Sequence, residues 1–133
     1  MKIRWLGALV SIFFLGSSVV ANAVTVETYT KWKQQIAKPY PYEEDANKTR
    51  LVLKAYLTGV AQGDYAAISL MKYKQKQNVI FQPYSCPPED LTADHKLAEK
   101  MIDAYIAAHP DIDKAANVAV IYVSQMAKTY PCK

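Results

Sequence analysis

Two cysteines and two histidines are the first side chains of this sequence that could carry chemistry. Cys86 and Cys132 stand far apart, so they form neither the Cys-x-x-Cys pair of a redox site nor the paired ligands of a zinc site. His95 lies near the polar start of a predicted helix, and His109 precedes Pro110 at the end of that helix. A histidine in either place is more often a capping or surface residue than a general base.

Acidic residues before the same helix are the next candidates. Glu89, Asp90 and Asp94 could act as paired carboxylates, but acids at a helix start already have an electrostatic reason to be there. The sequence contains no Gly-x-Ser-x-Gly, no phosphate-binding loop and no His-Glu-x-x-His. It therefore predicts no enzyme, no cofactor and no metal site, and favours a small binding or structural module.

The N-terminus has the pattern of a cleaved secretory signal peptide. Lys2 and Arg4 are followed by an apolar run and then by Ala21-Asn22-Ala23, the small residues that a signal peptidase reads. A membrane anchor is the alternative, but the apolar run is shorter than the ~20 residues of a membrane span. We expect a signal peptide over 1–23, a single domain over 24–133 and export to the periplasm, with no membrane attachment after cleavage.

Export makes a disulfide the natural state of the two cysteines, because an even cysteine count in an oxidising compartment normally means pairing. A Cys86–Cys132 bond closes a loop of about 46 residues and should contribute up to ~4 kcal/mol. Loss of Lys2 and Arg4 leaves 14 basic and 12 acidic residues, a net charge of about +2. That charge is too small to favour nucleic acid as a partner.

The elements that position these residues are predicted to be helices. Apolar residues recur at three- and four-residue steps and no stretch alternates at period two, so we expect an all-α bundle of four to five helices. The predicted helices cover 24–37, 43–74 and 92–108, and a last one runs from Asp111 or Asp113 to Tyr130. The disulfide then closes a C-terminal helical hairpin.

Caps and apolar faces define the two C-terminal helices. Thr92 is the expected N-cap of the first, and either Asp111 or Asp113 caps the second. The predicted core face of the first consists of Leu97, Met101, Ala104, Tyr105 and Ala108. That of the second consists of Ala115, Val118, Ala119, Tyr122 and Met126.

The long helix over 43–74 carries an unusual stripe. Its predicted apolar face is Val52, Tyr56, Gly59, Gly63, Ala66 and Leu70. Two glycines on one face suggest that another backbone comes close, either from this chain or from a second copy. The helix could also break near Gly63-Asp64.

Several of these segments together resemble the Tai/Rap immunity proteins, which protect bacteria against type VI secretion amidases. The residues that carry the resemblance are Phe81, Cys86-Pro87-Pro88, Leu91-Thr92, Ala104-Tyr105-Ile106, His109-Pro110, Ala127 to Tyr130-Pro131-Cys132 and, upstream, Tyr56-Leu57-Thr58-Gly59-Val60. The resemblance spans about Leu51 to Cys132. The sequence departs from the family at Ala55, where another glycine is frequent, at Gln62, where an acid is common, and in lacking cysteines nearer the N-terminus.

The resemblance implies a periplasmic protein, often a homodimer, that binds a secreted peptidoglycan amidase and blocks its active-site cleft. Two protruding segments are then expected to make the contact: Tyr84, Glu89 and Asp90 in the proline-rich loop, and His109 and Asp111 in the turn between the last helices. An acid-stress chaperone, also small, helical and disulfide-bonded, is the alternative function.

Overall fold

The computed structural model of this chain describes residues 23–38, 41, 43–77 and 82–133. Over these ranges it contains four helices and no strand: α1 (Val26–Ile36), α2 (Glu43–Lys76), α3 (His95–Ala108) and α4 (Val118–Thr129). The predicted all-α fold is confirmed. Residues 1–22 of the predicted signal peptide, and Phe81, lie outside the described residues.

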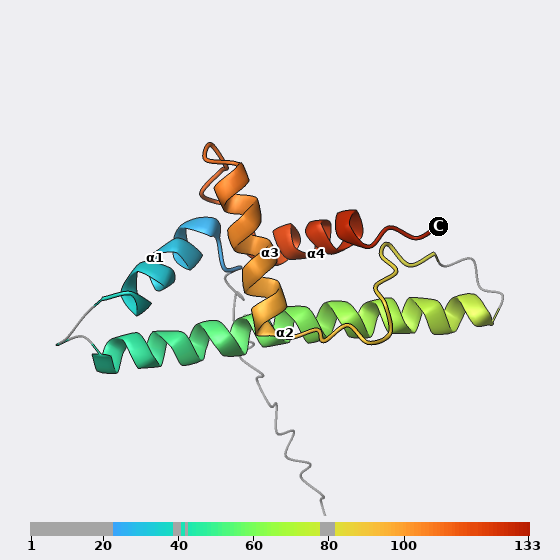
Figure 1. Ribbon diagram of the computed structural model, residues 1–133, viewed down its shortest axis with the longest axis horizontal. Helices are drawn as coiled ribbons and strands as arrows, with labels where there is room; N and C mark the ends of the chain where they lie inside the picture. The colour runs from blue at the N-terminus through green and yellow to red at the C-terminus, as the bar shows by residue number, and fades with distance from the viewer. Residues whose placement is uncertain (1–22, 39–40, 42, 78–81) are drawn as a thin grey trace, which may run out of the picture.

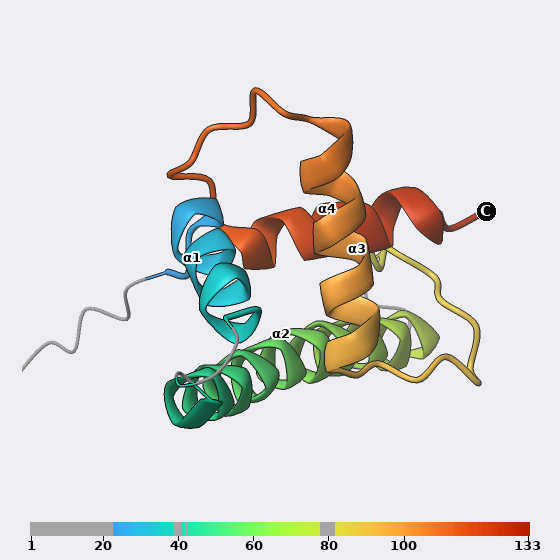
Figure 2. The same cartoon turned by 60° about the vertical axis from the view of Figure 1, so that its left-hand side comes forward.

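The long helix α2 forms the base on which the other helices are arranged (Figure 1). Helix α1 lies over the N-terminal half of α2 (Figure 1). Helix α3 stands across the middle of α2 and lies in front of α4. The axes of α3 and α4 cross steeply in both views (Figures 1 and 2). Acids in the first turn of α2 and lysines in its last turn both complement the helix dipole. The helix runs unbroken through Gly63-Asp64.

The face that α2 buries differs from the predicted one. Its buried residues are Ala46, Leu53, Leu57, Ala61, Asp64 and Ile68. Val52 and Leu70 are instead 52% and 58% exposed, and a Cβ added at Gly59 or Gly63 would meet no atom within 4 Å. The prediction was wrong because α2 carries apolar residues on two faces, and periodicity alone does not say which of them the other helices cover.

The core lies where α1, α3 and α4 meet the middle of α2. Its largest fully buried side chains include Tyr29 of α1, Leu57 of α2, Ile102 of α3, and Tyr122 and Met126 of α4. Within α3 the fully buried residues are Ala98 and Ile102. The predicted face residues Leu97, Met101 and Tyr105 of α3 are half-buried, while Ala104 and Ala108 are exposed, so this face too is rotated from the prediction.

Both predicted N-caps are corrected. Asp94, not Thr92, caps α3 by accepting hydrogen bonds from the amides of Lys96 and Leu97. Asn117, not Asp111 or Asp113, caps α4 by accepting from the amide of Ala119.

The start of α4 is delayed because the N-terminal segment pairs with the chain before it. The Val26 amide donates to the Ala116 carbonyl at 2.9 Å, and the Val118 amide donates to the Val24 carbonyl at 3.0 Å. Ala115 is thereby exposed and outside the helix, whereas Val118, Tyr122 and Met126 are buried as predicted. This pairing joins segments that are distant in sequence, so it could not be predicted from the residues next to either segment.

The Cys86–Cys132 disulfide is present, with the two Cα atoms 4.9 Å apart. It ties the loop before α3 to the residues after α4. Beside it the Cys86 amide donates to the Tyr130 carbonyl at 2.7 Å. The C-terminal third is therefore closed on itself, as predicted.

Candidate binding surfaces

The loop that contains Cys86, residues 82–94, is held on several sides, and we name it the anchored loop. Within this loop, the side chains of Pro83, Ser85 and Pro87 are buried. Lys72 of α2 donates to the Pro87 carbonyl at 3.4 Å, in addition to the disulfide and the Cys86 amide bond. The alternating buried residues leave little freedom for a loop that has no helical or strand structure of its own.

A buried polar cluster lies under the anchored loop. The Tyr84 hydroxyl donates to the Asp64 carboxylate, and Asp64 is only 6% exposed. The other Asp64 oxygen and the hydroxyls of Ser85 and Tyr122 are buried with no hydrogen-bond partner among the described residues. Burial raises the pKa of Asp64, and the hydrogen bond from Tyr84 only partly opposes that shift. Burial, followed by the bond to Asp64, raises the pKa of Tyr84.

The structure separates the predicted partner residues of the anchored loop into two kinds. Glu89 and Asp90 are exposed at its tip, where the Leu91 amide closes a turn by donating to the Pro88 carbonyl at 3.1 Å. Tyr84 is 36% exposed, but its hydroxyl points inward to Asp64. Glu89 and Asp90 are thus available to a partner as charges, whereas Tyr84 offers only part of its ring.

The second predicted contact is the turn from His109 to Asp113. The His109 ring stacks on Tyr105 with centroids 4.1 Å apart, and its Nδ1 lies 2.8 Å from the Tyr105 carbonyl oxygen. Asp111 is exposed, and Asp113 accepts from the Ala115 amide at 2.9 Å. This turn lies at the opposite end of α3 from the anchored loop, so the structure does not bring the two predicted contacts together (Figures 1 and 2).

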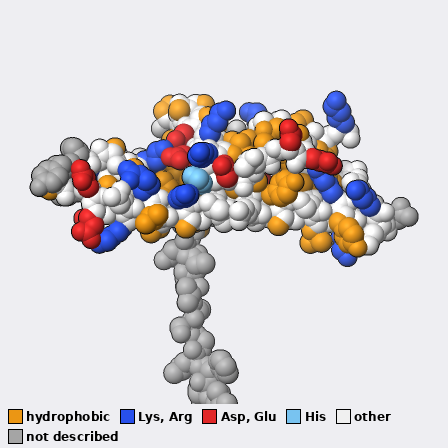
Figure 3. Space-filling model, turned by 60° about the horizontal axis from the view of Figure 1, so that its bottom comes forward, with side chains coloured by type: hydrophobic (Ala, Val, Ile, Leu, Met, Phe, Trp, Pro, Cys, Tyr) orange, Lys and Arg blue, Asp and Glu red, His pale blue; other side chains and the backbone are white. Residues whose placement is uncertain are grey.

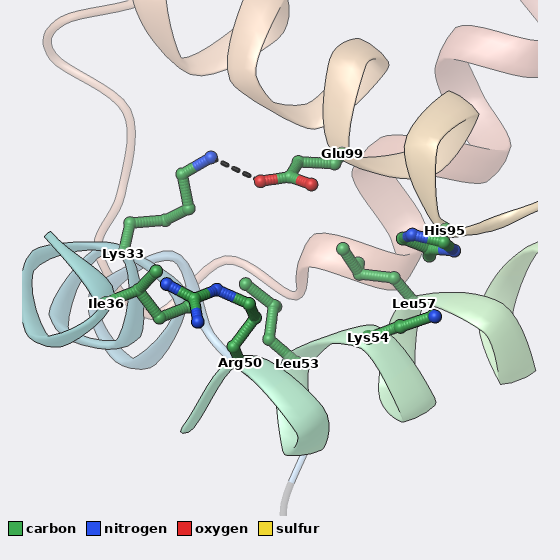
Figure 4. A pocket seen from close by; sticks show the side chains of 8 residues that line it. All are labelled: Lys33, Ile36, Arg50, Leu53, Lys54, Leu57, His95 and Glu99. Atoms are coloured by element: carbon green, nitrogen blue, oxygen red, sulfur yellow. Dashed lines mark hydrogen bonds and ion pairs between the residues drawn. The ribbon is translucent and has the colours of Figure 1, made fainter. Parts of the chain in front are cut away.

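A groove between α1, α2 and α3 was not predicted from the sequence. It encloses about 350 Å³, with Ile36, Leu53 and Leu57 as its apolar part (Figure 4). Its other lining residues are Lys33, Arg50, Lys54, His95 and Glu99. Among the described residues, no acid lies within ion-pair distance of Arg50 or Lys54. The only sequence signal was the four-residue spacing of Arg50 and Lys54, because the groove draws on three separate helices.

The lysine of this groove belongs to a bonded network that joins α1 to α3. Lys33 lies 2.5 Å from Glu99 and 2.9 Å from Asp103, which also accepts from the Tyr29 hydroxyl at 2.6 Å. Burial by itself lowers the pKa of Lys33, but the bonds to Glu99 and Asp103 outweigh it and the net shift is upward. Lys33 is therefore a structural cation, and the groove's unpaired positive charge comes from α2.

None of the three surfaces carries a group that could hold a metal ion among the described residues. Within the described ranges no group of three His, Cys, Asp or Glu residues could hold a metal ion. In the same part of the chain, no helix has both the length and the apolar character to cross a membrane. What the geometry offers is a rigid acidic tip, an exposed turn and a basic groove.

Comparison with known proteins adds no identity, because no protein-family model, no curated protein and no solved structure matches this chain.

Proposed function

We propose that this protein is a periplasmic immunity protein that binds a peptidoglycan amidase delivered by type VI secretion and occludes its active site. The observation that carries the proposal is the anchored loop, which presents Glu89 and Asp90 on a support tied down by the Cys86–Cys132 bond. The resemblance of this segment and of the C-terminus to the Tai/Rap proteins gives the partner class.

Occlusion is a physical mechanism that requires no catalytic residue in the inhibitor. A loop that already has its bound shape loses little conformational freedom when it fills a cleft, so more of the contact energy remains as affinity. The disulfide, the Cys86 amide bond and the Tyr84 bond to Asp64 supply that rigidity. Exposed carboxylates at the tip would add charge complementarity to basic residues around the amidase cleft.

The turn carrying His109 and Asp111 would make a separate, peripheral contact. Helix α3 has 14 residues and is therefore about 21 Å long, and the two segments lie at its opposite ends. One narrow cleft cannot receive both. We assign the anchored loop to the cleft and the turn to the rim of the interface.

The alternative, an acid-stress chaperone, would have to open its fold at low pH. Asp64, the buried carboxylate beneath the anchored loop, works against such opening. Its pKa is raised in the fold, so protonation at low pH relieves a cost of folding and stabilises the native state. We favour a protein that binds one folded partner at neutral pH, because the disulfide and the Cys86 amide bond hold the anchored loop in one shape.

The test starts from protein purified from the periplasm of expressing cells, whose chain should begin at Val24. Its binding to a panel of type VI amidases is measured by calorimetry at neutral pH, together with peptidoglycan hydrolysis. One amidase should bind stoichiometrically and lose activity. Capture of many unfolded proteins, at low pH only, would replace the proposal by the chaperone.

The cleft assignment is tested with the double variant Glu89→Gln/Asp90→Asn. It should weaken the complex about tenfold or more, because it removes both charges of the tip without changing side-chain size. The matched control is Glu43→Gln, an exposed acid at the start of α2, which should bind as the parent does. Equal affinity of all three proteins would exclude the anchored loop from the interface.

A further inference from the structure

The basic groove between α1, α2 and α3 has an aliphatic bottom. Leu53 and Leu57 of α2 close the bottom and are only 4% and 1% exposed, while Ile36 of α1 is half-buried and lines the same groove. The enclosed volume of about 350 Å³ is at the lower end of the range for small-molecule pockets. The groove is therefore large enough to receive a short chain molecule.

The two cations that α2 contributes lie on opposite sides of this bottom. Arg50 reaches towards the α1 side of the groove, whereas Lys54 reaches towards His95 at the start of α3 (Figure 4). One N–H of the Arg50 guanidinium donates to the side-chain oxygen of Asn47 at 2.5 Å, and the group has further N–H donors. Neither cation has an acid within ion-pair distance among the described residues.

The remaining polar residues of the groove do not neutralise these two charges. Glu99, the one acid in the lining, is bonded to Lys33 across the groove from α2 (Figure 4). His95 is half-buried, and its ring carries an N–H donor in either tautomer. Basic side chains gather around a histidine on the face that α2 and the start of α3 share (Figure 3). The groove therefore attracts anions at two separate points.

The side chains at the bottom restrict what can lie between those points. Apart from the His95 ring, every polar group of the lining side chains belongs to a charged residue. A peptide or a sugar would bury amides or hydroxyls against Leu53 and Leu57 without hydrogen-bond partners, which is costly. An aliphatic chain needs no such partners and gains by leaving water.

We propose that the basic groove binds a linear aliphatic dicarboxylate. One carboxylate pairs with Arg50, the other pairs with Lys54 and accepts from the His95 ring, and the chain between them lies over Leu53 and Leu57. Both the two unpaired cations and the aliphatic bottom are matched by this one class of ligand. This inference does not rest on amidase binding, and neither result decides the other.

The charge requirement is tested with three probes that share an eight-carbon chain: suberate with two carboxylates, octanoate with one and 1,8-octanediol with none. Each is titrated into the mature, disulfide-bonded protein, and binding is followed by amide chemical shifts in NMR spectra. Suberate should shift the amides of Leu53, Leu57 and His95 saturably and bind about two- to fivefold more tightly than octanoate, with the diol weakest. Octanoate or the diol binding as tightly as suberate, or no saturable shift at these amides, would overturn the proposal.

The two ends of the site are tested by substitution. Arg50→Gln and Lys54→Gln should each reduce suberate binding to about the octanoate affinity, and the double variant should reduce it to that of the diol. The matched control is Lys74→Gln/Lys76→Gln, which removes two charges from the last turn of α2 and should bind suberate as the parent does. Equal losses in the control and the groove double variant would contradict the proposal, because they would indicate only a general effect of net charge. A capped peptide with two aspartates around a leucine is the last probe. Tighter binding of this peptide than of suberate would mean that an acidic protein segment occupies the groove, which also contradicts the proposal.

Discussion

Tyr84 of the anchored loop donates its hydroxyl hydrogen to the carboxylate of Asp64, in the buried face of α2. The second oxygen of that carboxylate is buried without a partner in the described part of the chain, as are the hydroxyls of Ser85 and Tyr122. The loop is thus fastened to the long helix through a charge that burial makes unfavourable.

Replacing Asp64 with asparagine should raise the melting temperature at neutral pH. Asn keeps an oxygen to accept from Tyr84 and removes the buried charge. Because the folded-state pKa of Asp64 is raised by burial, the carboxylate costs stability above that pKa and ceases to do so as it becomes protonated. The gain should therefore shrink as the pH falls towards 4, which thermal unfolding at several pH values measures. A gain that is the same at every pH would contradict the electrostatic explanation.

The double variant Cys86→Ser/Cys132→Ser should lose about 3–4 kcal/mol of folding free energy, because the bond closes a loop of 46 residues. The comparison is His109→Ala, an exposed residue whose loss should cost only about 0.5 kcal/mol. Urea unfolding measures both changes, and thiol titration of the parent without reductant should find no free thiol. Equal losses in the two variants would mean that the closed loop does not stabilise the fold.

Tyr29→Phe should cost about 1–2 kcal/mol, because the Tyr29 hydroxyl donates to the charged Asp103 carboxylate while the ring fills the core. Burial, and then the bond to Asp103, raises the pKa of Tyr29, so its hydroxyl should remain protonated when exposed tyrosines ionise in alkali. Tyr73→Phe is the control at an exposed tyrosine of α2 and should leave stability almost unchanged. Ultraviolet titration should show the loss of an alkali-resistant tyrosine in Tyr29→Phe alone.

Asn117→Ala should cost about 1 kcal/mol, because it removes the side chain that accepts from the Ala119 amide at the start of α4. Asp111→Ala should change stability by less than about 0.5 kcal/mol, because Asp111 is exposed and does not cap the helix. Denaturant unfolding distinguishes the two. A larger loss of stability in Asp111→Ala than in Asn117→Ala would mean that Asp111 caps α4, which is one of the two positions predicted from the sequence.

The positions of the helices could be predicted from the sequence, because caps, prolines and apolar periodicity act over a few residues. The predicted helix over 43–74 is observed as Glu43–Lys76, and that over 24–37 as Val26–Ile36. The disulfide could also be predicted from the sequence, because two cysteines allow only one pairing. The exposed positions of Glu89, Asp90, His109 and Asp111 follow from their place in loops.

Only the tertiary structure decided which face of each helix is buried. Helix α2 has apolar residues on both the Leu53 side and the Val52 side, and only packing by α1, α3 and α4 selects the first. The delayed start of α4 at Val118 likewise depends on the bridge between Thr25 and Asn117, which are distant in the chain. The buried Asp64 and the basic groove also come from residues that only folding brings together. Local sequence fixes where a helix can form, but the side that leaves water is set by the summed burial of all the elements packed against it.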